Sequence, residues 1–195
     1  MNNNTKIVDN FLDQEYFDSL VSFFIENQGK EGGPSWNMQQ NIEGNFDHLT
    51  ADTTKLIAFV HFLYANTIAI VPHVNEKDIN EKEFFGIGQP CSPYFRGLLP
   101  ILEKLNIKSL IRVKANLYPY SGETLHEHEM HIDYDFPHYS AILSLNTCDG
   151  YTKLEDGTKV ESIANRMLIF DGNQKHCSTT TTSKFARINI NINYL

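Results

Sequence analysis

The spacing of apolar residues changes its period about halfway along the chain. In the first half, two segments place apolar side chains at helical spacing, whereas in the second half apolar and polar side chains alternate. The first helical segment spans residues 14–27, with Asp13 as a candidate N-cap and Gly29 just beyond its end. Its apolar positions are Phe17, Leu20, Val21 and Phe24. The second spans residues 93–106, where Pro100 must kink or restart the helix. Its apolar face consists of Phe95, Leu98, Leu99, Leu102 and Leu105.

Two other regions of the first half are not helical by this measure. Residues 29–54 are rich in Gly, Asn, Gln and Asp, which predicts a loop with room for one short strand. Residues 57–64 and 67–74 are rich in β-branched and aromatic residues. They predict a hairpin that turns at Ala65-Asn66, with helix as the competing interpretation of the first run.

A strict period of two begins at about residue 109 and predicts strands. In residues 109–120 the polar side is Arg112, Lys114, Asn116 and Tyr118, and the apolar side is Val113, Ala115 and Leu117. Turn signals such as Asp149-Gly150, Asp156-Gly157 and Asp171-Gly172 separate further strands, which we expect at 138–146, 150–156, 158–163, 166–172 and 184–195. Helices followed by short strands predict a mainly β (α+β) sandwich or barrel that the helices support.

Composition excludes several classes of function. A chain of 195 residues suits a single domain, here 1–195. Sixteen basic and 24 acidic residues give a net charge of −8 with no Lys/Arg cluster, which argues against nucleic acid as a partner. Three cysteines without a CxxC spacing indicate neither a disulfide framework nor a thiolate zinc site, and favour a reducing cytoplasm. The sequence shows neither a signal peptide nor a membrane span.

The stretch LHEHEMHIDY, residues 125–134, is dense in potential metal ligands. It contains no HExxH frame, so it does not predict a zinc-protease helix. The compact candidate is His131-x-Asp133, because alternate residues of a strand point to the same face. His176, just beyond a predicted strand end, could add a third ligand and complete a facial triad of two histidines and one carboxylate. Taken alone, a His-x-Asp pair is more often an exposed polar pair than a pair of ligands.

Two alternatives accompany this interpretation. His126-x-His128, with Asp133 or His131, would form a histidine-rich site of the cupin type, whereas with the His131 frame both histidines lie in an exposed loop or at the pocket mouth. Cys177 is expected to point away from His176 and to pack in the core.

Residues 184–195 contain a second informative row. Arg187, Asn189 and Asn191 alternate with Ile188, Ile190 and Ile192. This pattern fits a solvent-exposed edge, but it also fits isoleucines packed under helices with the polar row lining a barrel. In the second case, the barrel contains a buried guanidinium suited to bidentate binding of a carboxylate.

The order of these features resembles the 2-oxoglutarate and Fe(II)-dependent oxygenases, in their prolyl-4-hydroxylase-like branch. The pattern is His-x-Asp, a gap of some forty residues, a distal histidine after the strand LIFDG, and an arginine about ten residues later. It covers residues 109–195, and extends weakly to the opening VDNFLDQEYFDSL. Phrases such as RVKANLYPY and NRMLIFDGNQKH are similar to compact members from tailed bacteriophages, which would place the protein in the host cytoplasm.

The resemblance implies a fold and a metal centre. The fold is a double-stranded β-helix (jelly-roll, cupin-like), with residues 109–195 as the metal-binding core and residues 1–108, including the N-terminal helices packed on one sheet, as support. His131, Asp133 and His176 would bind Fe(II). Three protein ligands leave three octahedral positions, two for the 2-oxo acid and one for dioxygen.

The resemblance also implies the co-substrate site and the reaction. Arg187 would pair with the distal carboxylate of 2-oxoglutarate, and Tyr118, Asn116 and Asn189 would line the same pocket, with an ordinary core role as the alternative for Tyr118. The implied reaction is hydroxylation of an amino-acid side chain, with prolyl as one candidate, in a peptide, a protein or a small amino acid. A non-catalytic jelly-roll binding protein, for example one associated with a virion, is the alternative function.

Overall fold

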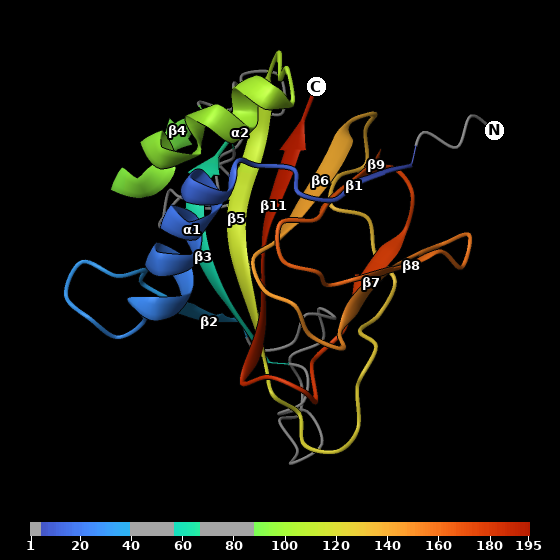
Figure 1. The fold of residues 1–195 in the computed structure, drawn as a ribbon. Helices are drawn as coiled ribbons and strands as arrows, with labels where there is room; N and C mark the ends of the chain where they lie inside the picture. Colours follow the sequence, from blue (N-terminus) through green and yellow to red (C-terminus); the bar gives the residue numbers. More distant parts are fainter. Residues whose placement is uncertain (1–4, 40–56, 67–87) are drawn as a thin grey trace, which may run out of the picture.

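The computed structural model describes residues 5–39, 57–66 and 88–195, and within them two antiparallel sheets form the architecture (Figure 1). The larger sheet has the strand order β1 (Lys6–Val8), β9 (Met167–Asp171), β6 (Tyr139–Ser144), β11 (Ala186–Tyr194), β5 (Leu110–Pro119), β3 (Ala58–Ala65) and β2 (Asn37–Gln39), and β4 (Gln89–Pro90) pairs with β3. The smaller sheet has the order β10 (His176–Ser178), β7 (Tyr151–Leu154) and β8 (Lys159–Glu161). Strands from both halves of the chain therefore share one sheet.

The helices cover one face of the larger sheet, on the side away from β7 and β8 (Figure 1). The first is α1 (Gln14–Val21), which continues as a π-helical turn, η1 (Ser22–Glu26), and Gly29 follows with a φ of +70°. Asp13 occupies the predicted N-cap position, but its side chain makes no capping hydrogen bond. The predicted amphipathic helix is thus confirmed, and it buries Phe17 and Phe24.

The second predicted helix is confirmed in two pieces that meet next to Pro100. A 3-10 segment, η5 (Pro93–Leu98), is followed by α2 (Leu99–Lys104), with Pro100 in its first turn. Proline fits that position because the first helical N–H groups have no partner within the helix. The predicted burial of Leu99 is wrong, since its side chain is 45% exposed. A change from three to 3.6 residues per turn at this point moves Leu99 off the apolar face.

The central strands β5 and β11 separate an apolar face from a polar one. Ile188, Ile190 and Ile192 are fully buried and belong to the same cluster as the helix residues and as Val113, Ala115 and Leu117 of β5. On the opposite face, a second apolar cluster joins the two sheets through Ile142, Leu168 and Phe170 of the larger sheet and Leu154 and Val160 of the smaller one. Each sheet therefore buries one face against the other sheet. This burial explains why apolar and polar residues alternate so regularly along the strands.

Other predictions from the sequence have mixed outcomes. The strand expected at 57–64 is confirmed as β3 (Ala58–Ala65), which extends through the first residue of the predicted Ala65-Asn66 turn. Residues 67–74, the second run of the predicted hairpin, lie outside the described residues. The strand β10 was not predicted. All three cysteines are free thiols, and Cys177 is buried. No helix within the described ranges is long and apolar enough to cross a bilayer.

Candidate metal centre and co-substrate pocket

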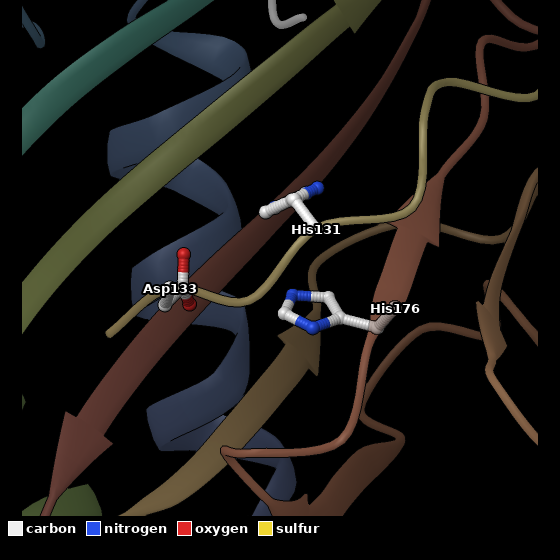
Figure 2. Close-up of side chains that lie close together, drawn as sticks. All are labelled: His131, Asp133 and His176. Atoms are coloured by element: carbon white, nitrogen blue, oxygen red, sulfur yellow. The ribbon is translucent and has the colours of Figure 1, made fainter. Parts of the chain in front are cut away.

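Three residues from two distant segments come together at the edge of the smaller sheet. His176 begins β10, and its backbone exchanges two hydrogen bonds with His131, of 2.9 and 3.0 Å, in an isolated antiparallel bridge. Asp133 follows two residues later in the same loop. Figure 2 shows the His176 ring projecting from β10 toward the loop that carries the other two residues. One ligand atom of each residue lies within 4.8 Å of the others, which confirms that the sequence pattern brings these three together.

The two imidazole rings are oriented by backbone carbonyl groups. The ring centroids are 4.7 Å apart. His131 Nδ1 lies 3.2 Å from the Glu129 carbonyl oxygen, and His176 Nδ1 lies 3.4 Å from that of Gln174. A proton on each Nδ1 would be donated to these carbonyl oxygens and would leave the lone pair of Nε2 free to bind a metal. Metal-binding histidines are commonly oriented in this way. Burial lowers the pKa of His176 to about 4, so this ring is neutral at neutral pH and can donate its lone pair.

Asp133 is held as a carboxylate by neighbouring donors. Arg112 Nη2 lies 2.6 Å from its Oδ1, while the Asn193 and Asn191 side-chain amides donate to Oδ2 at 2.9 and 3.3 Å. Burial by itself would raise the pKa of Asp133, but the charges of Arg112 and Lys114 outweigh it and bring the pKa below its usual range. Asp133 is therefore ionised at neutral pH. The donor set, two imidazoles and one carboxylate, fits a divalent iron ion.

The polar faces of β5 and β11 form the floor beside this centre. The register pairs Tyr118 with Arg187, Asn116 with Asn189, Lys114 with Asn191, and Arg112 with Asn193. Asn116 donates a 2.9 Å hydrogen bond to Asn189. A cavity is lined by the three candidate ligands, by Lys114, Asn116 and Tyr118, by Asn189 and Asn191, and by Ser178. Of the two interpretations of the Arg/Asn row, the solvent-exposed edge is wrong, because Arg187, Asn189 and Asn191 are all buried.

Arg187 is a fully buried cation, 1% exposed, and no carboxylate in the described part of the chain pairs with it. Its Nη2 donates to Thr152 Oγ1 at 2.8 Å and its Nη1 to the Thr179 carbonyl at 3.4 Å, whereas Nε has no partner. The guanidinium lies 5.5 Å from the centre of the Tyr118 ring, and that ring lines the cavity. A buried cation without a counter-charge is costly, so this position favours an anionic ligand.

The expectation that His126 and His128 are exposed or at the pocket mouth is wrong for His128, which is only 4% exposed, while His126 is half-buried. The backbone explains this: the His128 N–H donates to the Ser178 carbonyl at 2.9 Å, and this bond draws the loop against β10. Among the described side chains, neither histidine joins a cluster with metal-binding geometry.

Sequence reasoning did not assign roles to Arg112, Lys114 and Asn193. The signal was present, since Arg112 and Lys114 share the polar face of the strand with Asn116 and Tyr118. What was missing was the strand register, which places Arg112 and Asn193 opposite each other and both next to Asp133.

Comparison with known proteins identifies the fold. No protein-family model matches the chain, and no curated protein is similar to it. A prolyl hydroxylase from Trichoplax adhaerens, solved with a hypoxia inducible factor peptide fragment, is similar with a TM-score of 0.62 at 14% identity, covering 100% of this chain and 84% of that one. A 2OG-Fe(II) oxygenase family oxidoreductase from Burkholderia pseudomallei has a TM-score of 0.62 at 9% identity, covering 97% and 84%. A Pseudomonas putida prolyl-4-hydroxylase has a TM-score of 0.55 at 14% identity, covering 99% and 92%.

These likenesses confirm the expected fold class. The chain is mainly β, with a double-stranded β-helix core and N-terminal helices packed on one sheet. At such low identities the likeness concerns the fold, and the chemistry has to be argued from the residues of this chain.

Proposed function

We propose that the protein is an Fe(II)- and 2-oxoglutarate-dependent dioxygenase that hydroxylates a C–H bond of an amino-acid side chain. One observation carries the proposal: a cluster of two histidines and one aspartate, with ligand atoms within 4.8 Å, lies over the same strand faces as a buried arginine that no described carboxylate pairs with. A 2-oxo acid with a distal carboxylate needs both features, a metal at one end and a cation at the other.

Different residues of the chain would have different roles in the proposed site. His131, Asp133 and His176 would hold the iron, and Arg112, Asn191 and Asn193 would fix the carboxylate of Asp133. Arg187 would bind the distal carboxylate of 2-oxoglutarate, with Tyr118, Asn116 and Asn189 along the way from the metal. When bound, the iron supplies the oxidising chemistry, with 2-oxoglutarate converted to succinate and carbon dioxide. The protein therefore needs no nucleophile or acid/base pair of its own.

The proposed substrate is an amino-acid side chain, with prolyl in a peptide as the first class to test. Two of the three similar structures are prolyl hydroxylases, one of them with a peptide fragment, which supports this order of testing. Peptides that contain proline should gain one oxygen atom by mass spectrometry, in step with succinate formation. Free proline and free lysine test the small-molecule alternative in the same assay.

The first prediction concerns the metal. Asp133→Ala should abolish Fe(II) binding, measured by anaerobic calorimetry, and succinate formation in air, because two imidazoles alone bind the ion weakly. Asp135→Ala is the matched control, an exposed acid of the same loop, and should leave both unchanged. Unchanged iron affinity in Asp133→Ala would move the site to other ligands. A wild-type protein that binds no Fe(II) would instead favour the alternative function, a non-catalytic binding protein.

The second prediction concerns the co-substrate. Arg187→Leu should weaken 2-oxoglutarate binding at least tenfold and leave the metal affinity nearly unchanged, because the lost contact is charge-assisted and remote from the metal. Arg166→Leu is the control, since Arg166 forms a surface ion pair with Asp9, 2.5 Å long, and such pairs contribute little. Equal losses of metal and 2-oxoglutarate affinity in Arg187→Leu would remove Arg187 from this role.

A further inference from the structure

His128 is a buried side chain whose ring has no hydrogen-bond partner among the described residues. It is 4% exposed, and both Nδ1 and Nε2 lack a partner. Buried polar groups are nearly always satisfied, and leaving one unpaired is unfavourable. The position of His128 therefore calls for a ligand that supplies an acceptor.

The backbone fixes where this ring lies. The His128 N–H donates to the Ser178 carbonyl at 2.9 Å, and the preceding residue, Glu127, bridges to Thr179. These contacts hold the loop against β10 and the residue after it, on one side of the His131–His176 bridge. The His128 ring lies 5.3 Å from the Tyr118 ring, tilted by 38°. Tyr118 is thus flanked by His128 and by the Arg187 guanidinium.

Three unpartnered donors lie on the two neighbours of the Tyr118 ring and on Asn189, which lines the same cavity as Tyr118. Besides the His128 ring, they are Arg187 Nε and the side-chain amide nitrogen of Asn189, which is also buried. Donors that lack acceptors, one of them on a cation, indicate an anion with several oxygens. The charge of Arg187 acts electrostatically on the His128 ring.

We propose that His128 and Arg187 together form the pocket for the distal carboxylate of the 2-oxo acid, with His128 donating a ring N–H to one carboxylate oxygen. The inference rests on the proposed function and extends it to a residue outside the metal triad. Burial, followed by the charge of Arg187, lowers the pKa of His128 to about 4. The neutral ring carries one N–H, so it adds a directed donor without placing a second positive charge beside the guanidinium.

The test compares two 2-oxo acids on the Mn(II)-loaded protein without dioxygen, by calorimetry. 2-Oxoglutarate has the distal carboxylate, whereas pyruvate has the same metal-chelating end without it. His128→Phe should weaken 2-oxoglutarate binding about tenfold, and leave the affinities for pyruvate and Mn(II) unchanged. His128→Gln keeps an N–H donor near the position of Nε2 and should recover part of the loss.

His138→Phe is the matched control. His138 is also buried, 5% exposed, with an unpartnered Nε2, but its ring packs against Tyr134 and Phe136, whereas the His128 ring packs against Tyr118. This variant should bind 2-oxoglutarate as the wild type does. Circular dichroism and thermal unfolding identify any variant that fails to fold, and the Gln variant then provides the comparison.

The outcomes separate this inference from the proposed function. Equal weakening of 2-oxoglutarate and pyruvate, or the same loss in His138→Phe, would overturn the role of His128 while the oxygenase proposal stands. A drop in Mn(II) affinity in His128→Phe would make His128 a metal ligand instead. A wild-type protein that binds neither 2-oxo acid would overturn both proposals.

Discussion

Arg187 occupies space that depends on the absence of a side chain at position 150. A Cβ added to Gly150 would lie 2.7 Å from Arg187 Cδ, 2.7 Å from the Thr180 carbonyl oxygen and 3.0 Å from Thr179 Oγ1. Two of these contacts are closer than real Cβ atoms approach, and one involves backbone that cannot easily move. The glycine of the Asp-Gly turn therefore keeps room for the guanidinium as well as shaping the turn.

This close packing leads to a prediction at the residue scale. Gly150→Ala should lower the free energy of unfolding by about 1–3 kcal/mol, because the inserted methyl group forces Arg187 or the Thr180 backbone to move. The same shift should weaken 2-oxoglutarate binding while metal binding persists. Gly97→Ala, at a glycine with no atom within 4 Å of the added Cβ, is the control and should change neither quantity. Urea unfolding and calorimetry measure the two effects, and an equally stable Gly150→Ala variant would show that the site relaxes freely.

At the scale of elements, the strands that could be predicted best are those with both faces buried. β5 and β11 alternate strictly because one face packs under the helices and the other lines the cavity, so the sequence alone assigns each side chain to its face. The three-residue β10 has no such alternation, since its position is set by pairing with β7 and by the bridge from His131. The spacing of apolar residues cannot predict a strand whose position depends on its pairing partners.

The burial of His128 was beyond sequence reasoning for a related reason. The loop 120–131 meets residues 176–181 at three isolated bridges, Tyr120 with Thr181, Glu127 with Thr179 and His131 with His176, and at separate hydrogen bonds such as that from the His128 N–H to Ser178. The first two bridges are seven positions apart in the loop and two positions apart in the facing segment, so the pairing has no regular register. By contrast, His131, Asp133 and His176 could be selected, because ligand chemistry restricts the candidates more tightly than periodicity does.

Asp149 connects the turn before β7 to the turn between β10 and β11. It accepts hydrogen bonds from Thr181 Oγ1 at 2.6 Å, from the Thr182 N–H at 3.0 Å and from Ser183 Oγ at 3.0 Å. Burial alone would raise the pKa of Asp149, but these hydrogen bonds outweigh it and lower the pKa below its usual range. One carboxylate thus organises residues 181–183, between β10 and β11.

A pH-dependent prediction follows for this turn. Because the folded-state pKa of Asp149 is depressed, its ionised form stabilises the protein at pH values above the unfolded-state pKa of about 3.9. That contribution is lost as pH falls through the folded-state pKa. Asp149→Asn should therefore lower the free energy of unfolding by about 1 kcal/mol at pH 7, with a difference from wild type that shrinks below about pH 4. Urea unfolding at several pH values measures this, with Asp135→Asn as the exposed control; a difference that does not vary with pH would exclude the ionised carboxylate as the cause.

At the scale of the whole molecule, the N-terminal segment closes the core on which the site is built. β1 adds to the edge strand β9, and Phe11 and Leu12 are buried with the helices against the larger sheet. Asn165, in the turn before β9, holds this segment through both backbone polar groups of Leu12. The Leu12 N–H donates to Asn165 Oδ1 at 2.8 Å, and Asn165 Nδ2 donates to the Leu12 carbonyl at 2.8 Å. Residues 153 positions apart in the sequence are thereby joined.

Asn165 also has a φ of +62°, a conformation that asparagine adopts more readily than alanine. Two substitutions separate the two contributions. Asn165→Ala should lower the free energy of unfolding by about 2–4 kcal/mol, because it removes both buried hydrogen bonds and because alanine tolerates the left-handed conformation less well than asparagine does. Asn165→Gly removes the same hydrogen bonds but fits the backbone, so its loss should be smaller by about 1 kcal/mol. Urea unfolding gives both values, and hydrogen exchange at Leu12 should show lost protection in each variant. Equal losses in the two variants would show that the backbone conformation carries no cost, whereas retained protection at Leu12 would mean that the pairing with Asn165 does not hold the N-terminal segment in place.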